Sequence, residues 1–449
     1  MSKRITILGA GESGTGAALL AKAKGYDVFV SDKGIIKENF KDELRAYKIV
    51  FEEGFHTEER VLEADLIIKS PGIPDTAELV GKAIKNGIQV ISELEFAFKY
   101  TSKKIIAITG TNGKTTTTLL VHHLLQTAGV NATLAGNIGY SLARQVILDD
   151  SEVYVVEVSS FQLDGMFDFK ADVAILLNIT PDHLNRYDFK IENYVYSKLK
   201  VAQNMKANDL LIYSADDENI QKYLQTKNAA YSSCAVSINE NSTEAYLSDK
   251  ELNLIHNGKT KRYPIGKLPL KGPHNYINML AAIRAVMAFG LSQERIANGL
   301  ASFKNFPHRM EHLGSIKGVQ FVNDSKATNV EAVYYALNSY NVPITWIAGG
   351  VDKGNDYDKI SKIVSQKVKA LICLGEDNDA LKSYFGGIVQ VIKETKDIKE
   401  AAQMALEYSE KNDVVLLSPA CASFDLFKSY EHRGNAFKQA VVELKSQVL

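Results

Sequence analysis

Short apolar runs alternate with longer segments of helical spacing along the chain. In the first part of the sequence the runs cover positions 5–8, 28–30, 66–68 and 89–91. A short apolar run bounded by turns predicts a buried strand, and strands that alternate with helices predict a parallel sheet covered on both faces. We therefore expect a Rossmann-like α/β domain in residues 1–100.

The same alternation returns twice. Runs at 104–108, 153–158 and 173–177 predict a second set of strands, and runs at 344–347, 370–374 and 414–417 predict a third. Residues 226–264 are polar and predict a short β-rich excursion, and the segment from His274 is helix-like. Polar positions 99–104 and a linker-like segment at 303–309 separate the sets. We expect three α/β domains, over residues 1–100, 101–305 and 306–449.

Composition narrows the class of protein. The 449 residues are 45% hydrophobic and 23% charged, as in ordinary globular proteins. A formal net charge of −1 gives no signal for nucleic acid, and no apolar run can span a bilayer. The three cysteines, Cys234, Cys373 and Cys421, have no metal-site spacing and suit a reducing compartment. We expect a cytoplasmic monomer without nucleic-acid or membrane partners.

A glycine-rich turn at residues 110–115, Gly-Thr-Asn-Gly-Lys-Thr, follows one predicted strand and precedes a predicted helix over 116–126. Glycines in this context let backbone N–H groups close on phosphate oxygens at a helix N-terminus. Lys114 would reach the outer phosphates and the Thr115 hydroxyl would bind Mg²⁺. The spacing differs from the usual motif because only two residues separate Gly110 from Gly113. We predict a P-loop-type ATP site rather than a plain strand–helix turn.

A second glycine turn, Gly9-x-Gly11-x-x-Gly14, opens the first domain, and Asp32 ends the next predicted strand. This pattern is typical of a diphosphate nucleotide site, with the acid on a ribose. A nicotinamide oxidoreductase is one alternative, and close strand–helix packing without a ligand is another. Because the second domain already carries an ATP-type loop, we expect the first turn to hold a different ligand.

Two side chains at predicted strand ends indicate metal or phosphate chemistry. Glu157 ends an apolar strand, where a carboxylate is unfavourable unless it is paired or binds a cation, so it would complete a Mg²⁺ site with Thr115. His183 follows the next strand, beside Asp182. The alternatives are a helix-capping or satisfied acid at Glu157 and an ordinary core or surface histidine at His183.

Lys198 lies in a helix-like segment with Lys200, and the two cannot share one helix face. An ammonium is a poor metal ligand, and a lysine supplies anionic oxygens only after its neutral amine takes up CO₂ as a carbamate. From the residues alone, a solvated helix lysine is the favoured interpretation.

Several motifs together resemble the Mur ligases of peptidoglycan synthesis. They occupy positions 110–115, 136–139, 157–163, 178–183, Lys198 and 274–275. Three more, at 306–309, 323–329 and 417–424, resemble the members that join D-glutamate to UDP-N-acetylmuramoyl-L-alanine. Another Mur ligase or a folylpolyglutamate synthase-like amide ligase is the alternative within this chemistry.

The resemblance implies an N-terminal domain for the UDP-sugar, a central domain for ATP and a Rossmann-like C-terminal domain for the amino acid. It implies two Mg²⁺ ions, held by Thr115, Glu157, His183 and a carbamylated Lys198. Lys114, His183 and Lys198 would be catalytic. ATP would contact Gly110, Thr111, Asn112, Gly113, Lys114, Thr115, Thr116, Asn275, Arg309 and Asp324. The UDP-substrate would contact Gly11, Ser13, Asp32, Lys33, Gly72, Asn137, Ser159 and Gln162. D-glutamate would contact Lys326, Thr328, Lys353, Ser423, Phe424 and Tyr430.

Local structural roles remain possible in the third domain. Arg309 can be a surface arginine, residues 323–329 can form a helix N-cap, and Ser423 can cap a helix over 425–430. For the whole chain the alternatives to an amide ligase are the nicotinamide oxidoreductase and a nucleotide-gated binding module that makes no covalent product.

Overall fold

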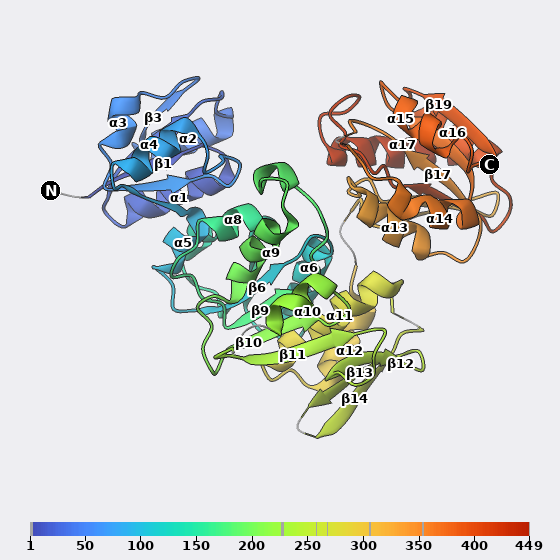
Figure 1. Ribbon diagram of the computed structural model, residues 1–449, viewed down its shortest axis with the longest axis horizontal. Helices are drawn as coiled ribbons and strands as arrows, with labels where there is room; N and C mark the ends of the chain where they lie inside the picture. The colour runs from blue at the N-terminus through green and yellow to red at the C-terminus, as the bar shows by residue number, and fades with distance from the viewer. Residues whose placement is uncertain are drawn as a thin grey trace. The chain divides into compact units, whose positions relative to one another are not determined.

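The computed structural model describes residues 3–225, 229–256, 258–266, 268–304, 307–352 and 354–448 (Figure 1). The chain forms two compact units: Met1–Leu268 with Ile277–Phe303, and Pro269–Tyr276 with Lys304–Leu449. The first unit contains two sheets and the second unit contains one. Among the described residues, no helix combines the length and the apolar character that a bilayer crossing requires.

The N-terminal sheet has the order β3-β2-β1-β4-β5, and every neighbouring pair is parallel. Its strands are β1 (Arg4–Leu8), β2 (Asp27–Asp32), β3 (Val50–Glu53), β4 (Leu66–Lys69) and β5 (Gln89–Ser92). Its helices are α1 (Glu12–Ala23), α2 (Glu38–Ala46), α3 (Glu58–Leu62), α4 (Glu78–Lys85) and α5 (Glu93–Phe98). The strand order reverses at β1, which places a crevice at its carboxyl end. The sequence analysis missed β3, because this edge strand carries Glu52 and Glu53 and no continuous apolar run.

The central sheet has the order β14-β13-β12-β11-β10-β9-β6-β8-β7. Its strands are β6 (Lys104–Thr109), β7 (Ala132–Gly136), β8 (Val153–Glu157), β9 (Val173–Leu176), β10 (Leu210–Ser214), β11 (Ser232–Ser237), β12 (Ala245–Ser248), β13 (Glu251–His256) and β14 (Lys259–Pro264). The strands from β7 to β12 pair in parallel, whereas β13 and β14 are antiparallel additions. The predicted β-rich excursion is therefore confirmed over β11 to β14, while residues 226–228 and 257 lie outside the described residues.

Helices and short 3₁₀ turns connect these strands. They are α6 (Lys114–Thr127), α7 (Leu142–Val146), α8 (Ser160–Asp164), η1 (Leu184–Arg186), α9 (Ile191–Leu199), η2 (Lys200–Ala202), α10 (Glu218–Leu224), α11 (Pro273–Met287) and α12 (Gln293–Ser302). The helix predicted from residue 116 thus begins at Lys114, inside the glycine turn. The helix-like segment at His274 is confirmed as the start of α11.

The C-terminal sheet has the order β15-β16-β20-β17-β18-β19, with only β15 antiparallel to its neighbour. Its strands are β15 (Glu311–Ile316), β16 (Val319–Asn323), β17 (Ile344–Ala348), β18 (Val368–Leu374), β19 (Val391–Thr395) and β20 (Val414–Leu417). Its helices are α13 (Val330–Asn338), α14 (Asp358–Lys367), α15 (Asp379–Phe385), α16 (Ile398–Glu407) and α17 (Tyr430–Val448). Trp346 on β17 is fully buried against Phe385, in a core between sheet and helices.

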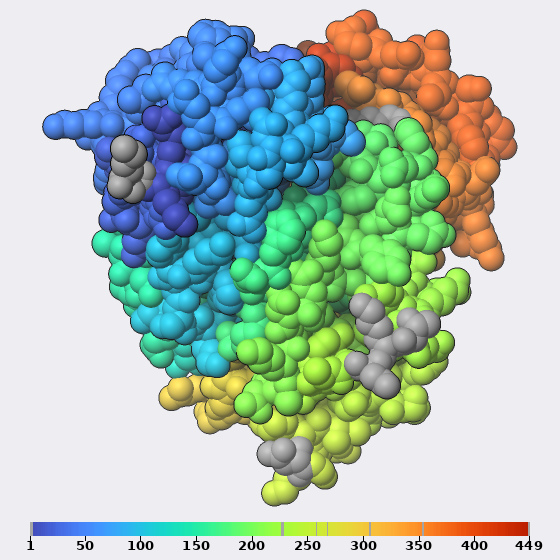
Figure 2. All heavy atoms as spheres, turned by 60° about the vertical axis from the view of Figure 1, so that its left-hand side comes forward, coloured from blue at the N-terminus to red at the C-terminus, as the bar shows by residue number. Residues whose placement is uncertain are grey.

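Within the first unit, α1 joins the N-terminal and central sheets. Its small residues from Gly14 to Ala18 are buried, and α1 packs on α5 and α7. A Cβ on Gly16 would lie 1.9 Å from Ser141 Oγ, so only glycine permits this approach. The blue residues of the first sheet meet the cyan and green residues of the second in Figure 2.

Candidate functional site

The glycine turn at 110–115 lies at the carboxyl end of β6, between β8 and β9. Gly110 has φ +151° and Gly113 has φ +85°, which L-residues with a side chain rarely adopt. A Cβ on Gly113 would lie 2.6 Å from Asn278 Oδ1 on α11. Backbone conformation and crowding therefore both require glycine at the start of α6.

The segment after β9 holds this turn in place. The backbone N–H of Thr111 donates to Asn178 O at 2.8 Å, and that of Asn112 donates to Asn178 Oδ1 at 2.8 Å. The Thr111 hydroxyl donates to Thr180 O and accepts from Thr180 N–H. The predicted motifs at 110–115 and 178–183 thus form one hydrogen-bonded structure.

Two lysines converge on one carbonyl of the turn. Lys114 Nζ and Lys198 Nζ each donate to Gly110 O at 2.8 Å. Lys198 is only 1% exposed, and burial followed by the nearby Lys114 charge lowers the pKa of its amine well below the ordinary lysine value. The interpretation of Lys198 as a solvated helix lysine was therefore wrong, because α9 turns this residue toward the phosphate loop.

Glu157 ends β8 and is 1% exposed. Its Oε1 accepts a hydrogen bond from Asn137 Nδ2 at 2.8 Å, while its Oε2 has no hydrogen-bond partner among the described residues. A buried carboxylate oxygen without a partner is unfavourable in the absence of a cation. Thr115, also buried, is the second residue of α6, which follows the neighbouring strand β6. These two oxygen donors fit Mg²⁺, which prefers few protein ligands together with phosphate oxygens and water.

His183 occupies a different environment. Its side chain is 51% exposed, its φ is +53°, and its ring lies 5.1 Å from that of Phe161. Its Nε2 is 3.6 Å from Asp182 Oδ2. Among the described residues no three His, Cys, Asp or Glu side chains cluster as a metal site.

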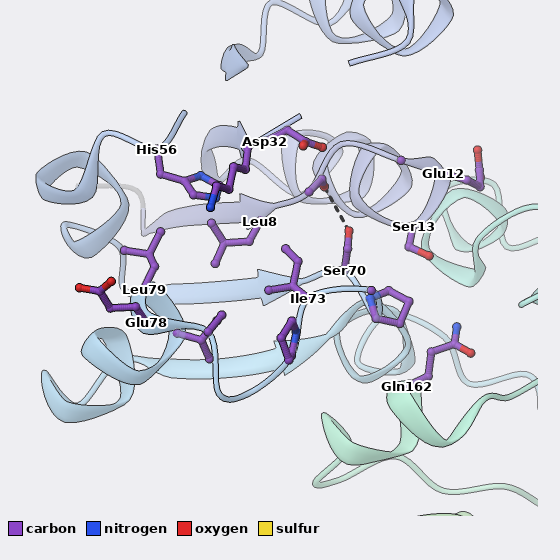
Figure 3. A pocket seen from close by; sticks show the side chains of 18 of the residues that line it. Leu8, Glu12, Ser13, Asp32, His56, Ser70, Ile73, Glu78, Leu79 and Gln162 are labelled. Carbon is purple, nitrogen blue, oxygen red and sulfur yellow. Dashed lines mark hydrogen bonds between the residues drawn. The ribbon is translucent and has the colours of Figure 1, made fainter. Parts of the chain in front are cut away.

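A cavity of about 1070 Å³ lies beside the first glycine turn and is lined by both sheets' connections (Figure 3). Most of the residues predicted for the UDP-substrate line it, namely Gly11, Ser13, Asp32, Lys33, Gly72, Asn137 and Gln162. Ser159 is not among the lining residues. Instead it caps α8, because its Oγ accepts Gln162 N–H and Gln162 Oε1 accepts Ser159 N–H.

Close contacts shape the mouth of this cavity. A Cβ on Gly14 would lie 1.8 Å from Gly9 O, so glycine is needed for α1 to follow β1 directly. Asp32 accepts hydrogen bonds from Ala10 N–H at 2.6 Å and Gly34 N–H at 2.8 Å. This predicted ribose-binding acid thus also fixes the turn. In Figure 3 the hydroxyl of Ser70 donates to Gly9 O and joins the turn to the loop after β4.

Arg186, which the sequence analysis missed, connects that loop to the central domain. Its guanidinium donates to the main-chain oxygens of Gly72, Pro71 and Ile73 and lies over the Phe161 ring. It is three residues after His183, so the same short segment reaches both predicted sites. Carbonyl acceptors occur at every residue, and no sequence pattern marks this contact.

The residues predicted for D-glutamate follow adjacent strands of the C-terminal sheet. Lys326 and Thr328 follow β16, and Ser423, Phe424 and Tyr430 follow β20. Lys326 Nζ lies 5.4 Å from the centre of the Tyr430 ring. Lys353 lies outside the described residues.

The local alternatives for this domain have mixed outcomes. Asn329 caps α13 by accepting Ala332 N–H at 2.8 Å, as an N-cap in residues 323–329 predicted. No helix covers residues 425–429, so the proposed capping role of Ser423 was wrong. Ser423 is instead buried in an irregular segment before α17.

The residues predicted for ATP in the second unit include a buried acid. Asp324 is 2% exposed and accepts Met310 N–H at 3.2 Å and the Ser418 hydroxyl at 3.0 Å. Burial raises its pKa to about 6, although the charge of Arg309 opposes that rise. Asn275 is buried and donates to Lys271 O at 2.8 Å.

A second arginine that sequence analysis missed, Arg433, binds the loops of this site together. Its guanidinium is 1% exposed and donates to the main-chain oxygens of Ser325, Gly349 and Cys421 and to the Ser325 hydroxyl. These residues belong to the connections after β16, β17 and β20. Burial lowers the pKa of Arg433 to about 10, and among the described residues its hydrogen bonds go to main-chain and hydroxyl oxygens rather than to a carboxylate.

Family models match all three regions of the chain. They are the MurD N-terminal domain over residues 4–79, the Mur ligase middle domain over 108–286 and the Mur ligase glutamate ligase domain over 308–421. The chain belongs to the Mur ligase family. It is therefore an ATP-dependent, amide-bond-forming ligase built from three α/β domains.

Similar proteins agree over the full length of the chain. The UDP-N-acetylmuramoylalanine--D-glutamate ligase of Cytophaga hutchinsonii is 50% identical over 448 residues, covering 99% of this chain and 100% of that protein. A pseudomurein peptide ligase type C from Methanothermus fervidus has a similar fold, with a TM-score of 0.63 and 22% sequence identity. The match covers 99% of this chain and 100% of that chain. The structure of MurF ligase from Thermotoga maritima in complex with ADP has a TM-score of 0.62 and 15% sequence identity. That match covers 99% of each chain.

Proposed function

We propose that this protein joins D-glutamate to UDP-N-acetylmuramoyl-L-alanine, with ATP as energy source, in the synthesis of peptidoglycan precursors. The position of Asn137 is the observation that supports this proposal. It lines the large cavity, and its side-chain amide donates to Glu157 beside the phosphate loop. One residue thus connects a pocket large enough for a nucleotide sugar to the carboxylate that fits Mg²⁺.

The turn at 110–115 would receive the ATP phosphates. Its N–H groups at the start of α6 and the Lys114 ammonium supply positive charge where negative charge accumulates. Lys114 Nζ donates to the Gly110 and Thr111 carbonyls, so it already lies over the turn. Asn275, Arg309 and Asp324 of the second unit are the proposed contacts for the rest of the nucleotide.

Mg²⁺ would be held by Thr115 and Glu157, and a second ion by His183 and Lys198 after its conversion to a carbamate. Bound there, Mg²⁺ would supply charge neutralisation for the phosphate oxygens. The neutral amine that burial favours at Lys198 is the form that reacts with CO₂. Gly110 O, which accepts from both lysines, holds that amine in position.

The reaction activates a carboxylate. An oxygen of the L-alanine carboxylate attacks the γ-phosphorus of ATP, the bond to ADP breaks, and an acyl phosphate forms. The amine of D-glutamate then adds to the acyl carbon, loses a proton, and phosphate leaves. The chain contributes by positioning the reactants and stabilising charge, as in other phosphoryl transfers.

D-glutamate brings two carboxylates to the C-terminal domain. Lys326 and Lys353 are proposed as their cationic partners, and Thr328 and Ser423 as hydroxyl donors. Phe424, which is 71% exposed, and Tyr430 would cover the aliphatic part of the amino acid. A pocket with such fixed partners rejects an amino acid that leaves them unpaired.

The direct test supplies ATP, Mg²⁺ and UDP-N-acetylmuramoyl-L-alanine with D-glutamate, L-glutamate, D-alanine, L-lysine or meso-diaminopimelate. Phosphate release and product mass are measured for each. We expect product and stoichiometric phosphate only with D-glutamate. Phosphate release without a new covalent product would favour the nucleotide-gated module, and oxidation of a nicotinamide cofactor would favour the oxidoreductase.

Lys114→Ala should abolish the reaction, and Lys399→Ala is a matched control because Lys399 forms an exposed ion pair with Glu443 and belongs to neither the cavity nor the phosphate loop. We further propose that the protein acts in the cytoplasm as a monomer. Light scattering of the active enzyme would test the monomer, and fractionation of cells would test the location.

A further inference from the structure

The first glycine turn places an acid where an anionic ligand is expected. Glu12 is the first residue of α1, and it lines the cavity between Gly11 and Ser13. A helix N-terminus after such a turn attracts phosphate, whereas a carboxylate at the same place repels it. Figure 3 shows Glu12 at the edge of the cavity, beside the ribbon of the central domain.

Arg144 of the central domain binds this acid. Arg144 Nε donates to Glu12 Oε1 at 3.0 Å and Nη2 donates to Glu12 Oε2 at 3.2 Å. This is the bidentate geometry of a strong arginine–carboxylate pair. Nη1 of the same guanidinium bonds Glu43 on α2, which does not line the cavity. The Arg144 side chain is only 21% exposed, so water screens the pair weakly.

The same acid fixes the loop that precedes Arg144. Glu12 Oε1 also accepts from Ser141 N–H at 3.0 Å and from the Ser141 hydroxyl at 3.1 Å. That loop follows Gly136, the last residue of β7, and begins with Asn137, and both residues line the cavity. A Cβ on Gly16 would lie 1.9 Å from Ser141 Oγ, so α1 and this loop approach each other closely.

We infer that Arg144 is a positioning residue for the UDP-sugar substrate. It neutralises Glu12, so that the glycine turn can accept a diphosphate, and it holds residues 136–141 against α1. The inference rests on the proposed function for the identity of the substrate. It goes further by making the diphosphate site dependent on a cation from the neighbouring domain.

The test compares Arg144→Ala, Glu12→Gln, the double variant and Arg144→Lys with wild type. Arg45→Ala is the control, because Arg45 forms exposed ion pairs on α2 with Glu38 and Asp42. In Arg144→Ala we expect KM for UDP-N-acetylmuramoyl-L-alanine to rise about tenfold, with KM for ATP and D-glutamate and kcat within about twofold of wild type. Arg144→Lys retains the charge but cannot form the same pair of bonds to Glu12, so its KM should lie between those of wild type and Arg144→Ala.

Comparing the double variant with Arg144→Ala separates the effect of an uncompensated Glu12 charge from the effect of losing the arginine side chain. In the double variant Glu12 has no carboxylate, so loss of Arg144 leaves no unpaired negative charge in the turn. The KM for UDP-N-acetylmuramoyl-L-alanine should therefore return to within about threefold of wild type. Added salt should reduce the defect of Arg144→Ala and leave the double variant unchanged. A double variant as impaired as Arg144→Ala, or a KM equal to that of the Arg45→Ala control, would overturn the inference.

A binding measurement keeps this test independent of turnover. Calorimetric titration of UDP into wild type and each variant should give the same order of affinities as the KM values. If wild type binds UDP but makes no product, the proposed function fails while the role of Arg144 is still decided by the UDP affinities. Melting curves confirm that each variant is folded.

Discussion

Replacing Lys198 by Met should abolish ligation and leave the fold at least as stable at low pH. Methionine keeps the length and apolar volume of the buried stem but has no amine. Lys198 is 1% exposed, and its Nζ lies 2.8 Å from the oxygen that also accepts Lys114 Nζ at 2.8 Å. The two nitrogens are therefore at most 5.6 Å apart, twice that distance.

The magnitude follows from this geometry. Two positive charges at that separation repel by about 3 kcal/mol at an effective dielectric constant of about 20. The lost hydrogen bond to Gly110 O costs about 1 kcal/mol, because Lys114 still satisfies that carbonyl. Burial away from water, and after it this repulsion from Lys114, both penalise a charged Lys198, so the folded protein disfavours its protonation.

The sign of the pH dependence is set by the lowered pKa of Lys198. As pH falls below the ordinary lysine pKa, Lys198 becomes protonated in the unfolded chain but stays neutral in the folded chain. The wild type therefore loses stability until pH reaches the lowered pKa of Lys198 in the folded state. In that window the advantage of Lys198→Met should grow by about 1.4 kcal/mol per pH unit. Urea unfolding in CO₂-free buffer at several pH values measures it.

Activity assays complete the test. Wild type should lose activity when CO₂ is removed and regain it with bicarbonate, whereas Lys198→Met should be inactive in both conditions. Lys198→Ala should regain some activity with a short carboxylic acid that supplies the missing oxygens. Lys200→Met is the control, because Lys200 is partly exposed and contacts Asp164. A fully active Lys198→Met, or a stability difference that does not change with pH, would refute the reasoning.

Three further substitutions test the remaining groups. Glu157→Gln should raise the Mg²⁺ concentration needed for half-maximal rate at least tenfold, because it removes charge from the carboxylate with a partnerless oxygen, and full activity in excess chelator would contradict the metal site. Asp324→Asn should impair turnover but stabilise the fold by about 3 kcal/mol at pH 7 and by nothing at pH 3. Because the pKa of Asp324 in the folded wild type is about 6, the stability of the wild type falls as pH rises from about 4 to about 6, and urea unfolding at several pH values measures this change. Arg433→Lys should raise KM for D-glutamate about tenfold and KM for ATP less than threefold, and an equal change in both would exclude a specific role at the amino-acid loops.

Sequence reasoning succeeded where the signal is local. The turn at 110–115 was recognisable because glycines at required positive φ, a lysine and a threonine lie within one strand–turn–helix segment. The apolar runs found several central strands for the same reason, but β10 (Leu210–Ser214) and β16 (Val319–Asn323), which also lie inside their sheets, were missed. Other missed strands, such as β3, lie at edges or carry mixed residues, and pairing with a neighbour decides their conformation.

The burial of Lys198 shows the opposite case. Its own segment has the pattern of an ordinary amphipathic helix, and although Lys198 and Lys200 lie on different faces, nothing in that pattern shows which of the two is buried. Only the packing of α9 beneath the phosphate loop places one lysine inside and leaves the other partly exposed. The resemblance to a family suggested a special role, but the physical reason for that role, a charge suppressed by burial and by the neighbouring Lys114, is a property of the folded chain.

The arginines that local patterns missed have a common explanation. Arg186 and Arg433 bind main-chain oxygens, which every residue offers, and Arg144 binds a carboxylate 132 positions away. None of these contacts constrains the residue types around it, so no spacing can reveal them. Each arginine nevertheless holds a loop that carries predicted substrate contacts, and their substitutions should therefore change the KM of one substrate rather than the chemistry common to all.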